Sequence, residues 1–150
     1  MRRISATFLL LTVGSAASCK STPPQVAGKW HGTSQLTATF TTALSSKPRN
    51  ENVPADFVLV LTQNGQTVQG DASVTAAKNP PIHIPINTGV IGPDGKLSLE
   101  GDASFTLAQA HLSFDGKAER GKITGTVDVA LSNVGGSGEN KGPLVLTPTS

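Results

Sequence analysis

Apolar and polar residues alternate with a period of two along most of the chain after residue 25. The clearest case is residues 56–75, DFVLVLTQNGQTVQGDASVT, where two strand-like runs flank Asn64-Gly65. An Asn-Gly pair between such runs is typical of a two-residue hairpin turn, which needs positive φ at both central positions. We predict strands near 56–63 and 66–75. Both faces of the first are apolar, so we expect it to be covered on both sides or to lie against a neighbour.

The preceding residues continue the alternation. Residues 26–44 have one parity that includes Trp30, Phe40 and Leu44, which predicts one long strand, or two joined by a bend at 32–34, with Trp30 facing inward. Residues 45–54, SSKPRNENVP, are polar and contain two prolines, so they are predicted to form an exposed loop.

The second half repeats the pattern. Strands are expected at 82–90, with Ile82, Ile84, Ile86, Thr88 and Val90 on one face, and at 97–105, 108–114, 123–131 and 143–147, with turns at 92–95 and 119–122. Pro85 lacks a backbone donor, which indicates an edge, a bulge or an imperfectly closed sheet. The glycine-rich residues 133–142 are expected to form a mobile loop.

One short pattern occurs three times. Gly70, Gly101 and Gly125 each occupy the inward row of a strand that follows a turn. A glycine there indicates a sharp bend or the close approach of a neighbouring side chain, as at the corner of a barrel.

These elements predict an all-β domain over residues 26–150. About eight sequential antiparallel strands, each with one apolar face, favour an up-and-down meander that closes into a barrel and so leaves no free edges. A two-layer β-sandwich is the alternative.

The first 18 residues, MRRISATFLLLTVGSAAS, have the anatomy of a secretory signal peptide: two arginines, an apolar run and small residues. Cys19 follows and is the only cysteine, so it has no internal disulfide partner. Ala16-Ala17-Ser18-Cys19 resembles the lipobox of bacterial lipoproteins. The resemblance implies cleavage before Cys19 and its acylation, with palmitate-type chains anchoring the protein to a membrane, and makes residues 19–25 a lipidated N-terminus and tether. Ordinary cleavage that leaves a soluble protein is the alternative.

The same resemblance bears on location. Lys20, rather than Asp, follows Cys19, which in a Gram-negative lipoprotein implies the outer membrane of the cell envelope. Without Arg2 and Arg3, which belong to the leader, ten basic residues balance ten acidic ones. Nucleic acid is therefore not expected as a partner, and the sequence shows no Lys/Arg cluster for an anionic membrane surface.

Gly28-Lys29-Trp30, at the start of the first strand, resembles the Gly-x-Trp signature of calycins, the lipocalin and avidin-like barrels. The resemblance implies that Trp30 plugs one end of a β-barrel. The chain is similar in this respect to small bacterial lipoproteins with calycin-like barrels.

Candidate chemistry is sparse. His31, His83 and His111 lie on the polar parity of separate strands without the short spacing of a zinc site, and no metal or cofactor is expected. Asp71, Asp102 and Asp128 occupy similar outward positions, where alternation already requires polar residues. No nucleophile, base and orienting partner can be named, so we expect a protein that is not an enzyme.

Three functions are compared. The first is a barrel that binds a small apolar ligand in a pocket bordered by Trp30, Leu59, Leu99 and Phe114. The second is a structural or protein-interaction module of the envelope, which contacts another protein or the cell wall through an exposed apolar patch or a free sheet edge, with the region around Pro85 as the candidate edge. The third, a hydrolase, requires a polar cleft that combines a histidine with a carboxylate.

Overall fold

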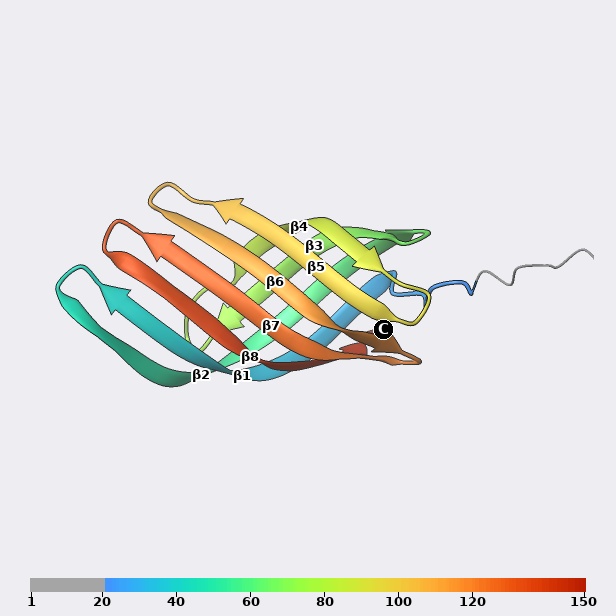
Figure 1. Ribbon diagram of the computed structural model, residues 1–150, viewed down its shortest axis with the longest axis horizontal. Coiled ribbons are helices and arrows are strands. Elements are labelled where there is room, and N and C mark those ends of the chain that lie inside the picture. The colour runs from blue at the N-terminus through green and yellow to red at the C-terminus, as the bar shows by residue number, and fades with distance from the viewer. Residues whose placement is uncertain (1–20) are drawn as a thin grey trace, which may run out of the picture.

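Eight antiparallel strands form a closed barrel in the computed structural model, which describes residues 21–150, without the side chains of residues 45 and 46. The strands are β1 (Gly28–Thr42), β2 (Ser45–Asn64), β3 (Thr67–Ala76), β4 (Ile82–Ile91), β5 (Lys96–Ser104), β6 (Ala108–Glu119), β7 (Lys122–Asn133) and β8 (Gly136–Pro148). Each strand pairs with the next, and β8 pairs with β1 (Figure 1). The predicted all-β meander is therefore confirmed, and the sandwich alternative is wrong.

The two ends of the barrel differ. The N-terminal segment and the β2–β3, β4–β5 and β6–β7 turns lie at what we call the closed end, on the right in Figure 1. The β1–β2, β5–β6 and β7–β8 hairpins project from the opposite, open end, while the β3–β4 connection is set back behind them. Because β1 and β2 contain 15 and 20 residues and β3 and β4 only 10 each, the wall is longer on one side.

The inward rows of the strands form one apolar core. Phe57, Leu59 and Leu61 of β2 expose at most 2% of their surface, as the alternation predicts. Val60, on the other face of the same strand, is 48% exposed, so the expectation that this strand is covered on both sides is wrong. A closed barrel encloses only the inward row of each strand, so the outer face of β2 borders solvent.

Residues 45–54 are not the predicted loop but the first half of β2. They pair with β1 from Thr42↔Ser45 to Gln35↔Pro54, whereas the pairing of β2 with β3 begins at Ala55. The backbone carbonyl of Pro54 accepts a hydrogen bond from the Ala77 N–H (3.0 Å), so its backbone nitrogen faces away from β1. Proline is tolerated on that side because no donor is required where the second neighbour is missing.

The glycine-rich residues 133–142 are also strand rather than loop. Only Val134 and Gly135 form the turn, and β8 pairs with β7 on one side and β1 on the other. Gly138 lies beneath the ring of Phe40: a Cβ added there would lie 2.9 Å from Phe40 Cδ1. Glycine serves here to let an aromatic ring lie flat on the neighbouring strand.

The β2–β3 hairpin is confirmed, but its turn is centred one residue later than predicted. Asn64 pairs with Thr67, which leaves Gly65 and Gln66 at the centre. Gly65 has φ of 61°, and Gln66 is not among the positive-φ residues. Positive φ at the first central position alone is the pattern of a type II′ turn, which glycine at that position favours.

A bulge follows Pro85 in β4. The register with β5 shifts between Ile86 and Thr88, so the parity of the strand changes. Thr88 and Val90, which were expected to face inward, are exposed, while Ile91 is buried. The bulge predicted from Pro85 is present, and it accounts for the error, since one extra residue exchanges the two faces of a strand.

The repeated inward glycines are sites of close approach, as expected. A Cβ added at Gly70, Gly101 or Gly125 would collide with a backbone carbonyl of a neighbouring strand. At Gly125 it would also lie 2.7 Å from Phe114 Cζ, so this glycine makes room for the buried ring of Phe114.

Candidate functional site

The closed end is sealed by a network around Trp30. Its indole Nε1–H donates to the Val26 carbonyl (2.8 Å), and the Val26 N–H donates to Gln63 Oε1 (2.7 Å). Gln63 Nε2 in turn donates to the carbonyl of Pro24 (3.1 Å). Trp30 is 6% exposed and Val26 is fully buried, so the segment before β1 folds across this end of the barrel. A ligand cannot enter here without breaking these bonds.

The four residues expected to border a ligand pocket lie in the packed core. Leu59, Leu99 and Phe114 expose 2%, 0% and 1% of their surface, and Trp30 belongs to the same cluster. With so little surface open to water, these three side chains border no pocket. The centre of the barrel is filled in the manner of other small barrels, by alternating large and small residues.

Towards the open end, the inner face of the barrel is hollow. A cavity of about 360 Å³ lies inside the projecting wall formed by β1, β8 and β7. Its apolar side chains are Phe40 and Leu131, which are followed along their strands by Thr42 and Asn133. We call this cavity the mouth pocket. It has the size of known small-molecule sites, and it combines apolar side chains with a few polar groups.

A buried amide lies deeper in the barrel than the residues that line the mouth pocket. Asn140 is 8% exposed and its Nδ2 donates to the Val129 carbonyl (2.9 Å), one row further into the barrel than Gly138. This hydrogen bond joins the amide to the neighbouring strand β7. Sequence reasoning missed this pocket, although Phe40 already stood in the inward row. The missing signal was the length of the β1–β2 hairpin.

The outer face carries one histidine–carboxylate pair. His111 Nδ1 and Asp102 Oδ1 lie 2.7 Å apart on β6 and β5, with 48% and 70% of the two side chains exposed. They border a hollow of about 300 Å³ whose lining also includes Glu139 and two residues of the inward rows, Leu131 and Gly138. An exposed pair of this kind contributes little to stability because water screens it.

The pair lacks the other parts of a hydrolytic site. Among the hydrogen bonds of residues 21–150, no serine hydroxyl contacts His111, so no nucleophile is positioned for it. His31 and His83 lie on other strands, and Asp71 makes no ion pair within the described part of the chain. Asp128 is half-buried, and its Oδ1 has no hydrogen-bond partner there. No group of three His, Cys, Asp or Glu side chains in the described residues could hold a metal ion.

Cys19 and the leader lie outside the described residues. No protein-family model matches the chain, and no curated protein matches it. The closed eight-stranded antiparallel meander fits a calycin-like fold. From Ser21 onward, the chain contains no helix that is long and apolar enough to cross a membrane.

Proposed function

We propose that the protein is an exported lipoprotein of the cell envelope whose barrel is a non-catalytic binding module for a small apolar ligand. The observation that supports a ligand is the mouth pocket, because the rest of the interior is filled and the closed end is sealed. The pocket is open to solvent on the side of the projecting hairpins, so a ligand reaches it without unfolding the barrel.

The ligand proposal is tested with residues 21–150, which contain every strand and the whole described core, and with the fluorescent apolar probe N-phenyl-1-naphthylamine. Leu131→Asn places a polar group against the pocket, and we expect probe affinity to fall about tenfold, as for the loss of one buried leucine contact. Val145→Asn, at a 45% exposed site on the outer wall, is the matched control and should bind like the parent. Equal affinity in Leu131→Asn and the parent would overturn the proposed pocket.

The anchor is supported by the leader and by the position of Cys19, the single cysteine, directly after it. Mass spectrometry of the mature protein should show an N-terminal Cys19 that carries acyl chains. Cys19→Ala should release the protein from the membrane fraction, since several chains are needed for stable anchoring. In a Gram-negative cell, Lys20 directs the anchored protein to the outer membrane. An unmodified N-terminus would remove the anchor and leave the ligand proposal standing.

A protein partner is the second candidate function, and one observation favours it. The pairing of β4 with β5 begins at Ile86, so residues 82–85 have a neighbour only in β3. A partner strand could add to this short edge, although Pro85 provides no donor. Affinity capture from solubilised envelopes with His83→Ala and Pro85→Ala variants tests this, because unchanged partners would exclude the edge.

A further inference from the structure

Large apolar side chains are exposed at the tips of the three projecting hairpins. Leu44 of the β1–β2 turn is 100% exposed, Leu107 of the β5–β6 turn 72%, and Val134 of the β7–β8 turn 88%. Phe105, beside Leu107, is 46% exposed. Each tip therefore shows at least one large apolar residue to solvent, and all three point the same way (Figure 1). We call these residues the apolar tips.

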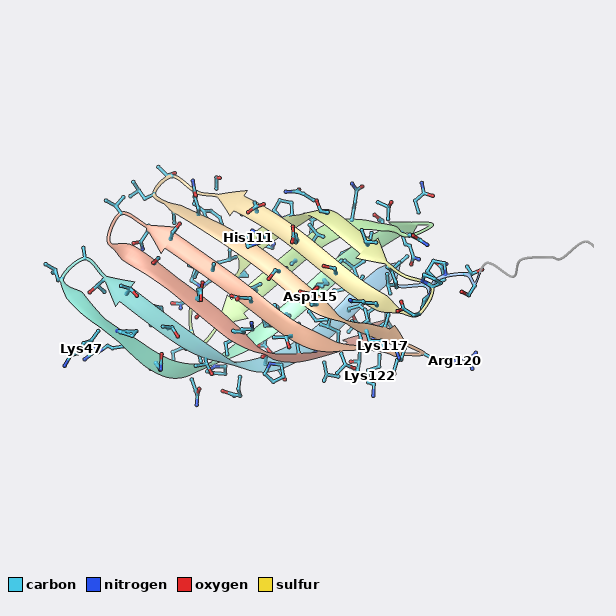
Figure 2. All side chains as sticks on the ribbon, in the orientation of Figure 1. Lys47, His111, Asp115, Lys117, Arg120 and Lys122 are labelled. Carbon is cyan, nitrogen blue, oxygen red and sulfur yellow. The ribbon has the colours of Figure 1, made fainter. Side chains whose placement is uncertain are left out.

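The β1–β2 hairpin carries two cations, and the carboxylates next to the three hairpin segments are Glu51, Asp102 and Glu139 in the adjoining strands. The hairpin segments 41–50, 104–109 and 132–138 contain Lys47 and Arg49 and no aspartate or glutamate. Lys47 lies at the far end of the β1–β2 hairpin (Figure 2). Asp115 lies further back, on the outer face of β6 (Figure 2). Lys47 and Arg49 follow Leu44 by three and five residues on the same hairpin, so both cations accompany this one of the three tips.

Separate apolar tips combined with cations match a lipid surface better than a protein surface. A protein partner buries a continuous apolar patch, whereas three separated tips can each enter the boundary between lipid headgroups and acyl chains. Lysine and arginine next to such tips are attracted to anionic headgroups. We propose that the open end of the barrel docks on an anionic lipid bilayer through Leu44, Leu107 and Val134, with Lys47 and Arg49 against the headgroups.

This docking is independent of the mouth pocket and of acylation. If Cys19 is acylated as proposed above, the anchored chain joins the barrel at its closed end, and the tips face away from the anchoring membrane. The tips then contact a second lipid surface, and the barrel bridges the two.

The test is flotation of residues 21–150, which carry no leader and no acylation site, with vesicles of phosphatidylglycerol and phosphatidylcholine. We expect binding to the anionic vesicles, and about tenfold or more loss in a Leu44→Thr/Leu107→Thr/Val134→Thr variant. The matched control is Val60→Thr/Val90→Thr/Val145→Thr, which changes three exposed apolar residues of the outer wall and should bind like the parent.

A second pair of variants compares the loss of two cations at the open end with the loss of two at the closed end. Lys47→Gln/Arg49→Gln should weaken binding about fivefold for each cation removed, and added salt should weaken the parent in the same way. Lys117→Gln/Lys122→Gln removes two cations at the closed end (Figure 2) and should have no effect. Circular dichroism verifies that each variant is folded.

Several results would overturn the proposal. The parent chain could fail to float with anionic vesicles, or the tip variant could float as well as the parent. Loss of binding in Lys117→Gln/Lys122→Gln, with binding kept in Lys47→Gln/Arg49→Gln, would place the lipid contact at the closed end. A dimer that forms without vesicles and that the tip substitutions dissociate would assign the tips to a second copy of the chain.

Discussion

The two ends of this barrel are made of the same eight strands and the same alternation, yet they differ in what they bury. At the closed end the inward row is sealed by Trp30, whose ring is 6% exposed and whose Nε1–H is bonded to Val26. At the open end the same row of β1 ends in Phe40, which is 40% exposed above Gly138. Alternation therefore decides which face a residue lies on, and strand length decides whether anything covers it.

The difference has a simple geometric origin. β1 and β2 extend beyond the point where β3 begins to pair. Leu36 and Ala38 of this stretch are still buried, whereas Phe40, nearer the tip, is left partly uncovered. A side chain with no partner across the barrel keeps its contact with water and gains little from the hydrophobic effect. The closed end thus stabilises the fold, and the open end leaves apolar groups available for binding.

We expect the largest difference in stability between two leucine substitutions, one in the filled centre of the barrel and one at an open tip. Leu99→Ala in the filled centre should lower the free energy of unfolding of residues 21–150 by about 3 kcal/mol, because it leaves a cavity in a packed core. Leu107→Ala at an open tip should change it by less than about 0.5 kcal/mol, since 72% of that side chain is already exposed. Urea denaturation measures both, and equal effects would erase the distinction between core and tips.

Glycine substitutions should give the next largest contrast. Gly125→Ala adds a methyl group 2.6 Å from Gly116 Cα and 2.7 Å from Phe114 Cζ, which should cost about 1–3 kcal/mol by overpacking. Gly135→Ala, in the β7–β8 turn, meets only Asn133 Oδ1 at 3.5 Å and should be close to neutral. Thermal melting of the two variants compares them directly. A stable Gly125→Ala barrel would mean that the core there is looser than described.

The seal at the closed end should have an intermediate effect. Trp30→Phe keeps an aromatic ring but loses the hydrogen bond to the Val26 carbonyl, so we expect a loss of about 1–2 kcal/mol. Phe40→Leu at the open end should cost less, because that ring is only partly covered. If Phe40→Leu proved the more damaging in urea denaturation, the open end would be the part that stabilises the fold.

The smallest effect is expected on the outer wall. Asp102→Asn removes the charge that faces His111, but 70% of the Asp102 side chain is exposed. The change should alter the melting temperature very little, in line with the value of about 0–1 kcal/mol for exposed pairs. A large shift would show that this pair is more than a surface contact.

The sequence predicted the fold class and most of the inward rows, because both depend on alternation alone. Phe57, Leu112 and Val127 face the core as their parity requires. The errors fall where the backbone changes the count or the length. One bulged residue after Ile86 reversed the faces of Thr88 and Val90. Residues 45–54 and 136–142 are strand because they pair with neighbouring strands, despite their prolines and glycines.

The candidate site was harder to predict for the same reason. The mouth pocket and the apolar tips exist because some hairpins project further than others, and a hairpin's projection depends on which strands pair with it. The sequence around Leu44 and Val134 does not show whether a neighbouring strand covers these two side chains. Lys47 and Arg49 already lie close to Leu44 in the sequence, but only the fold brings their hairpin to the same end of the barrel as the other two tips.

Tryptophan fluorescence tests the contrast between the ends most directly, since Trp30 is the only tryptophan of the chain. With anionic vesicles added to residues 21–150, the emission of Trp30 should stay unchanged, because its ring is sealed at the closed end. In a Trp30→Phe/Leu107→Trp variant, which moves the reporter to an open tip, the emission should shift to the blue. An unshifted tip reporter, or a vesicle-dependent change at Trp30, would contradict the account.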